Sequence, residues 1–154
     1  MLLRIFLSFT LLATVSSRTP TKLRSLWNFE RITECVLHHT ALVYNNYGCW
    51  CGVGGSNEPV DGIDDCCMHH DKCYDRAVDS KICFDVPWEY VDNYNWKCMN
   101  STAVCDNEQT GCAAALCACD TEVVRCWSKF PKPTTKPSCN RSRHNPRTKF
   151  FEPQ

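Results

Sequence analysis

His70, Asp71 and Asp120 are the residues whose types and spacing could do chemistry. An imidazole titrates near neutral pH, so His70 could remove a proton from a water molecule. The carboxylate of Asp71 offers hard oxygen ligands to a cation, and a carboxylate such as Asp120 can orient a histidine ring. These residue types are typical of a general base that works beside a cation site.

Two helices are predicted to carry these residues. His70 shares one helical face with Cys66 and Cys73, and Asp120 shares one with Cys119 and Cys126. The two cysteines of each helix are seven residues apart, about 10.5 Å along the axis.

If the helices run antiparallel, Cys66–Cys126 and Cys73–Cys119 fit one register. That register places His70 within a turn of Asp120. Both polar side chains would face the shared interior, where burial without a partner is costly. We therefore expect them to pair.

Fourteen cysteines, all between Cys35 and Cys139, define the class of protein. An even number at this density in a secreted chain is typical of a disulfide framework, and the spacing alone does not select the pairing of seven bridges. About 130 residues follow Arg24, which is consistent with one small domain.

The N-terminus is typical of a secreted protein. Residues 1–17 combine a basic start, an apolar run and small residues, as in a signal peptide, and the run is shorter than the about 20 residues of a membrane span. Residues 18–24 end in an arginine and are a candidate propeptide. Residues 25–139 would form the domain, and residues 140–154 a basic, disordered tail. We expect an extracellular protein without a transmembrane segment.

The charge distribution argues against nucleic acid as a partner. The formal net charge of the chain is zero, but residues 25–139 contain nine Lys or Arg and sixteen Asp or Glu. An acidic domain repels polyanions, and it predicts no strong attraction to anionic lipid.

Local patterns predict the elements before the two helices. Apolar residues from Leu26 onward recur near helical spacing and indicate an amphipathic N-terminal helix, with His38 and His39 solvated near its end. The glycine-rich stretch 47–55 should be a loop, and a turn precedes a helix starting near Asp64.

The later segments show three further patterns. Alternating aromatic residues in 87–98 favour a short antiparallel hairpin. The proline-rich chain after Phe130 should be extended. Asn100 and Asn140 begin glycosylation sequons.

Three of these stretches resemble motifs of the secreted phospholipases A2. The run Cys-Cys-Met-His-His-Asp-Lys-Cys at 66–73 resembles the active-site helix, and Leu-Cys-Ala-Cys-Asp at 116–120 resembles the aspartate-bearing motif. The run at 47–55 resembles the calcium loop. Leu-Trp-Asn-Phe at 26–29 and the cysteine pattern resemble the pancreatic type, group I. The implied fold is mainly α and disulfide-rich, with an N-terminal helix, a calcium loop, two long antiparallel helices and a small β-hairpin.

The resemblance implies calcium-dependent hydrolysis of the sn-2 acyl ester of glycerophospholipids at lipid interfaces. The Ca²⁺ ligands would be the carbonyl oxygens of Trp50, Gly52 and Gly54 and the carboxylate of Asp71. Trp50 stands where the family often has tyrosine, a change that a main-chain ligand should tolerate. The N–H of Gly52 would help to stabilise the oxyanion.

The resemblance also assigns the catalytic roles. His70 would remove a proton from the attacking water, and Asp120 would fix the tautomer and orientation of the ring. Tyr74 and Tyr94 match tyrosines that hydrogen-bond the aspartate. No serine or cysteine nucleophile and no acyl-enzyme are expected.

The disulfides and the lipid contacts follow from the same resemblance. The implied bridges are Cys35–Cys98, Cys49–Cys139, Cys51–Cys67, Cys66–Cys126, Cys73–Cys119, Cys83–Cys112 and Cys105–Cys117. The substrate channel and phosphate contact would be formed by Leu26, Phe29, Tyr44 and Tyr90. Trp27 and Val53 could touch the lipid surface, with phospholipid membranes or micelles as partners. Thr33 replaces the usual apolar channel residue.

Two alternatives compete with a monomeric lipolytic enzyme. A zinc site formed by Cys66, Cys67, His69 and His70 is disfavoured by secretion and complete cysteine pairing. A non-catalytic phospholipase-like toxin or receptor-binding module would be indicated by loss of the histidine or the calcium-binding aspartate, and both are present.

Overall fold

The computed structural model describes residues 22–84 and 93–139. The elements in chain order are α1 (Lys22–Leu37), the 3-10 helix η1 (Ala41–Val43), α2 (Gly62–Asp79), the strands β1 (Trp96–Met99) and β2 (Thr102–Cys105), and α3 (Gly111–Trp127). This mainly helical, disulfide-rich architecture confirms the predicted fold class. Among the described residues, no helix is long and apolar enough to cross a membrane.

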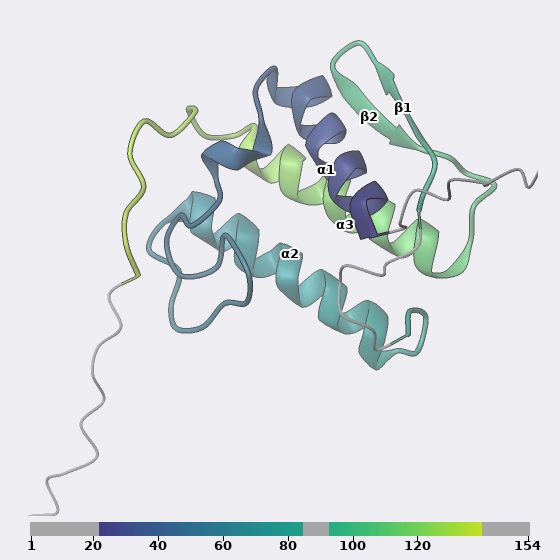
Figure 1. Cartoon of the computed structure of the whole chain (residues 1–154), viewed down its shortest axis with the longest axis horizontal. Helices are drawn as coiled ribbons and strands as arrows, with labels where there is room; N and C mark the ends of the chain where they lie inside the picture. Colours follow the sequence, from purple (N-terminus) through teal and green to yellow (C-terminus); the bar gives the residue numbers. More distant parts are fainter. Residues whose placement is uncertain (1–21, 85–92, 140–154) are drawn as a thin grey trace, which may run out of the picture.

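The helices α2 and α3 lie side by side and form the centre of the molecule, with α1 packed on α3 (Figure 1). Helix α2 begins at Gly62, two residues before the predicted start, because the carboxylate of Asp61 accepts hydrogen bonds from the N–H groups of Ile63 and Asp64. The buried face of α3 includes Leu116. Disulfides cross-link α2 to α3 around this core.

Seven disulfides join the described cysteines, and no described cysteine is free. The bridges are Cys35–Cys98, Cys49–Cys139, Cys51–Cys67, Cys66–Cys126, Cys73–Cys119, Cys83–Cys112 and Cys105–Cys117, the same pairs that the family resemblance implies. Two of them cross-link α2 to α3 in the antiparallel register predicted from cysteine spacing. Because Cys66 and Cys67 are both oxidised, they are not available as zinc ligands.

A short antiparallel hairpin is present, and residues 87–92 of the stretch predicted to form it lie outside the described residues. The ladder pairs Trp96 with Cys105 and Met99 with Thr102, so the hairpin starts near the end of the predicted stretch 87–98. Its turn is made by Asn100 and Ser101, whose φ angles of 50° and 57° match a two-residue turn with left-handed residues. This turn joins β1 to β2. Asn100 is exposed at this turn.

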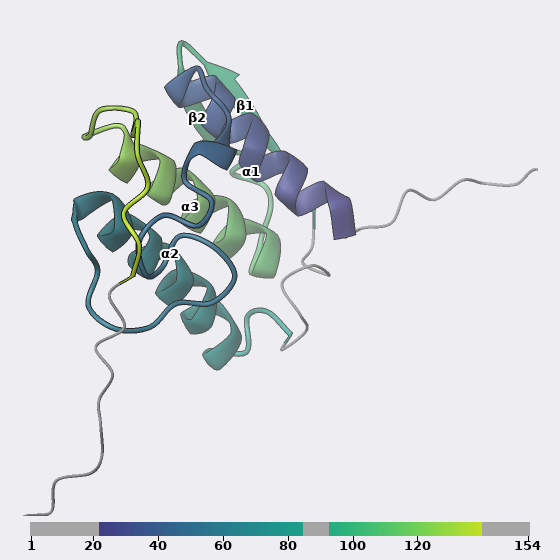
Figure 2. The same ribbon diagram turned by 60° about the vertical axis from the view of Figure 1, so that its left-hand side comes forward.

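The chain after α3 has no regular secondary structure up to residue 139, as predicted, and it returns to the glycine-rich loop (Figure 2). The N–H of Gly48 donates to the carbonyl of Pro137 at 2.8 Å, and Gly48 forms a parallel bridge with Ser138. The ammonium of Lys136 donates to the carbonyls of Leu42 and Asn45. This segment therefore braces the loop that precedes α2.

Candidate active site

The centre of the site is a hydrogen bond between α2 and α3. His70 Nε2 lies 2.8 Å from Asp120 Oδ1, and the Asp120 side chain is 1% exposed. An ionised carboxylate only accepts hydrogen bonds, so Nε2 carries the proton in this pair. The neutral imidazole then has Nδ1 as its basic nitrogen.

Two tyrosines complete the partners of Asp120. The hydroxyl of Tyr74 donates to Oδ1 at 2.8 Å, and the hydroxyl of Tyr94 donates to Oδ2. Burial, together with the charge and hydrogen bond of Asp120, raises the pKa of Tyr74 and of Tyr94 well above 10. Both phenols therefore remain protonated donors, and three donors compensate the buried carboxylate.

Aromatic contacts restrict the orientation of the His70 ring. Phe29 from α1 stacks on it with 5.4 Å between centroids and 14° between planes. The ring of Tyr74 meets it edge-on at 4.7 Å. Phe29 also contacts Trp127, whose indole N–H is buried without a hydrogen-bond partner among the described residues. Helix α1 thus covers the imidazole from one side.

Asp71 follows His70 on α2 and is half-buried. Burial is the main cause that raises the pKa of its carboxyl to about 6. The neighbouring charge of His70 lowers this pKa, whereas Asp75 and Asp64 raise it. Within the described chain, Asp71 makes no ion pair with Lys, Arg or His. A half-buried carboxylate without such a partner is suited to a cation.

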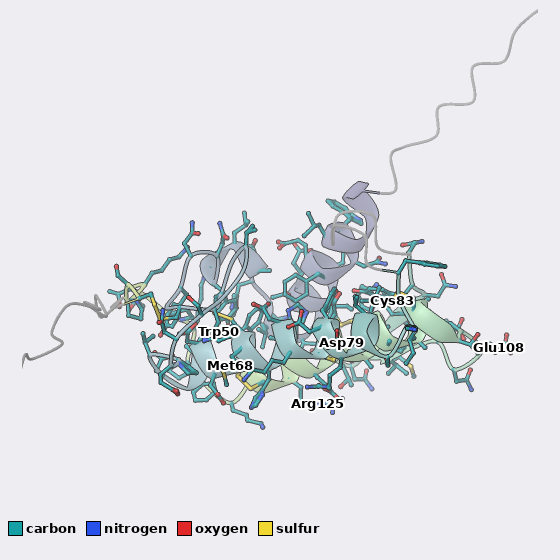
Figure 3. All side chains as sticks on the ribbon, turned by 90° about the horizontal axis from the view of Figure 1, so that it is seen from below. Trp50, Met68, Asp79, Cys83, Glu108 and Arg125 are labelled. Carbon is teal, nitrogen blue, oxygen red and sulfur yellow. A yellow bond between two sulfur atoms is a disulfide. The ribbon has the colours of Figure 1, made fainter. Side chains whose placement is uncertain are left out.

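The loop between Tyr47 and Gly55 lies over the first half of α2 (Figure 3). Asp64, which is fully buried on α2, holds it: its carboxylate accepts from the N–H groups of Cys49 at 2.8 Å, Trp50 at 2.7 Å and Val60 at 2.9 Å. The loop is therefore ordered by the same helix that carries His70 and Asp71.

Two glycines permit this close approach. Gly48 has a φ of +63°, and a Cβ built on it would lie 2.3 Å from the Asp64 carboxyl carbon. A Cβ on Gly55 would lie 2.1 Å from the indole of Trp50. That indole donates to the carbonyl of Asn57 at 2.9 Å and lies under the ammonium of Lys72. The half-buried Trp50 side chain thus packs against Gly55 within the loop.

The donor set of the loop fits Ca²⁺. The carbonyl oxygens of Trp50, Gly52 and Gly54 accept none of the backbone hydrogen bonds in the described loops and turns. Together with Asp71 they provide main-chain and carboxylate oxygens, which calcium prefers. No described cluster of three or more His, Cys, Asp or Glu could hold a metal on side chains alone. A cavity of about 600 Å³ also opens along the loop, but His70 and Asp71 do not line it.

The residues expected to meet lipid differ in their exposure. Leu26, Trp27 and Val53 are 45%, 64% and 83% exposed, whereas Tyr44 is buried and stacks on Trp127 with 3.8 Å between centroids. Tyr90 and the sequon residue Asn140 lie outside the described residues.

Thr33 is fully buried, and its hydroxyl donates to the carbonyl of Phe29. The expected solvation of His39 was wrong. Its ring is hydrogen-bonded to the Leu37 carbonyl and the Tyr44 hydroxyl, because η1 folds the chain back over α1. His38 is exposed, as expected.

The sequence is similar to one known protein family over most of its length. The family model for phospholipase A2 matches residues 26–139. A phospholipase A2 of Bos taurus is 38% identical over 134 residues, covering 84% of this chain and 91% of the bovine protein. The chain belongs to the phospholipase A2 family. A phospholipase A2 of Ovis aries is 40% identical over 112 residues, covering 70% of this chain and 89% of the ovine protein. The group 10 secretory phospholipase A2 of Mus musculus is 41% identical over 103 residues, covering 67% of this chain and 65% of the mouse protein.

Sequence reasoning missed Asp64 as the residue that orders the loop in this phospholipase A2 chain. In the sequence it is one of three acidic residues at the start of α2, where carboxylates commonly favour the helix N-terminus. A usable signal is its spacing of seven residues from Asp71, which places both on one face of the helix.

Replacing Asp64 with Asn should release the loop, because one amide oxygen cannot accept three N–H groups. We expect a loss of about 3 kcal/mol in the free energy of unfolding and faster amide exchange at Cys49, Trp50 and Val60. Denaturant unfolding and hydrogen exchange measure both effects. Asp65→Asn, at the half-exposed neighbour, is the matched control and should change stability by less than about 0.5 kcal/mol. Equal effects of the two changes would contradict the role of Asp64.

Proposed function

We propose that this chain hydrolyses the sn-2 acyl ester of glycerophospholipids in a calcium-dependent reaction, releasing a fatty acid and a lysophospholipid. The family match and the relatives named phospholipase A2 support phospholipase A2 activity in general. The single observation that carries the finer proposal is the His70–Asp120 pair beside the half-buried carboxylate of Asp71.

In this proposal His70 is the general base. Since Nε2 is held by Asp120, Nδ1 accepts a proton from water, and the resulting hydroxide adds to the ester carbonyl carbon. The carbon–oxygen bond to the glycerol then breaks, and His70 returns the proton to the leaving alkoxide. Asp120 stabilises the imidazolium formed in between. No covalent acyl-enzyme is required.

The developing negative charge on the carbonyl oxygen needs stabilisation. The N–H of Gly52 would donate a hydrogen bond to it. Trp50, Gly52, Gly54 and Asp71 would hold Ca²⁺, which when bound supplies positive charge that polarises the ester carbonyl.

The chain would act as a secreted monomer bound peripherally to phospholipid membranes or micelles. Leu26, Trp27 and Val53 provide exposed apolar surface for such contact. The acidic balance of residues 25–139 favours apolar insertion over attraction to anionic lipid. A non-catalytic binding module is the alternative, but the complete pair and Asp71 favour the enzyme.

Activity on mixed phospholipid vesicles tests the proposal. We expect fatty acid release from the sn-2 position that stops on addition of a calcium chelator and resumes with added Ca²⁺. His70→Gln should lower kcat by at least about 10³-fold, because the variant loses both the general base and the group that orients the attacking water. His69→Gln, at the exposed neighbour, is the matched control and should retain activity. Release that persists in chelator, or in His70→Gln, would rule out this mechanism.

Calcium affinity should depend on pH through Asp71. Its carboxyl, with a pKa of about 6, is protonated below that pH and must lose the proton to bind Ca²⁺. The calcium Kd should therefore rise about tenfold per pH unit below 6 and be nearly constant above 7. Calorimetric titration at several pH values measures it. Asp75→Asn should move the transition to lower pH, because it removes a like charge. A constant Kd from pH 5 to 7.5 would contradict this assignment.

Processing and glycosylation are proposed from the sequence. Residues 1–17 would be removed as a signal peptide and residues 18–24 as a propeptide, and Asn100 and Asn140 would carry glycans. N-terminal sequencing of protein secreted from eukaryotic cells should then begin at Ser25, and a start at Arg18 would contradict the propeptide. Asn100→Gln and Asn140→Gln should each reduce the mass by one glycan.

A further inference from the structure

Tyr94 must be placed accurately, yet it lies in neither a helix nor a strand. Tyr94 is 2% exposed, and its hydroxyl donates to Asp120 Oδ2. Residues 93–95 form an irregular segment that leads into β1. Asn95 is tied to β2 by one backbone hydrogen bond, because its carbonyl accepts from the N–H of Asp106 at 3.0 Å. Tyr94 makes no such backbone bond to another described residue, so side-chain contacts must help to fix its position.

Asn28 of α1 holds this segment from one side. Its Nδ2 donates to the carbonyl of Tyr94 and to Oδ1 of Asn93, both at 2.9 Å. Its Oδ1 accepts from the indole N–H of Trp96 at 3.3 Å. The next residue on α1, Phe29, stacks on His70, so consecutive residues contact both ends of the catalytic hydrogen-bond network.

Gln109 holds the segment from the other side. Its Oε1 accepts from the N–H of Asn95 at 2.8 Å, and its Nε2 donates to the carbonyl of Asn95 at 3.0 Å. One side-chain amide thus pairs with both backbone groups of Asn95, and it adds to the hydrogen bond that the Asn95 carbonyl accepts from the N–H of Asp106. Gln109 lies two residues before Gly111, the first residue of α3, the helix that carries Asp120.

We propose that Asn28 and Gln109 are positioning residues, which fix Tyr94 so that its hydroxyl reaches Asp120 and aligns His70. The inference rests on the proposed function. Neither amide touches the reacting groups, and both act through Tyr94. Loss of either allows the 93–95 segment to shift, which lengthens the Tyr94–Asp120 hydrogen bond and leaves the carboxylate with weaker compensation.

A double-mutant cycle tests this coupling. Asn28→Leu and Gln109→Leu should each lower kcat on vesicles by about three- to tenfold, the range expected for a weakened hydrogen bond to a charged group. KM and the calcium Kd should stay unchanged. In a Tyr94→Phe background, neither change should lower kcat further, because the residue through which they act no longer contacts Asp120. Full additivity with Tyr94→Phe would overturn the proposal.

Two neighbouring asparagines are matched controls. Asn93→Ala removes the second partner of Asn28 but leaves its bond to Tyr94, and Asn107→Ala changes an exposed residue of the loop that contains Gln109. Both variants should keep the kcat of the unmodified chain. A loss equal to that of Asn28→Leu or Gln109→Leu would show that the effect is not specific to Tyr94.

A spectroscopic measurement separates this inference from the proposed function. The NMR resonance of the proton on His70 Nε2 reports the bond to Asp120 without requiring turnover. It should move in the same direction in Asn28→Leu, Gln109→Leu and Tyr94→Phe, and stay in place in the controls. If the chain hydrolyses no phospholipid, the proposed function fails while these shifts still test the positioning. An unmoved resonance in both amide variants would overturn the inference.

Discussion

The buried carboxylate of Asp120 is the group on which the rest of the structure depends. A charge in a protein interior is unfavourable unless hydrogen-bond donors compensate it. The donors come from separate parts of the chain: His70 and Tyr74 from α2, and Tyr94 from the segment before β1. These elements must therefore keep their relative positions. The disulfides that join α2 to α3 on either side of His70 keep the helices in this register.

A second buried carboxylate, that of Asp64 on α2, is also compensated by hydrogen-bond donors from another part of the chain. It is stabilised by N–H groups of the loop, and in return it gives that loop a single shape. Asp64 and Asp71 are seven residues apart, so they share a face of α2. One helix thus places the loop, the candidate calcium carboxylate and the proposed general base, and its rigidity keeps their spacing constant.

Local pattern predicted the helices and the pairing between them better than it predicted the irregular segments. The seven-residue cysteine spacing in α2 and α3 was sufficient for their register, because a helix has a fixed rise per residue. The hairpin extends past the predicted stretch because its turn lies at Asn100 and Ser101, whose left-handed backbone the aromatic pattern does not indicate. His39 was expected in solvent because nothing local shows that η1 folds back to offer it Tyr44.

The sequence by itself determined the helical faces that carry His70 and Asp120, because these follow from spacing within single helices. Its motifs also carried the resemblance to the family that the comparisons confirm. Only the tertiary structure decided the role of Asp64, the partners of Asn28 and Gln109, and the burial of Tyr44 and Thr33. These contacts join residues separated by loops. Their geometry depends on how the whole chain packs, and the periodicity of residues within one helix or strand does not predict it.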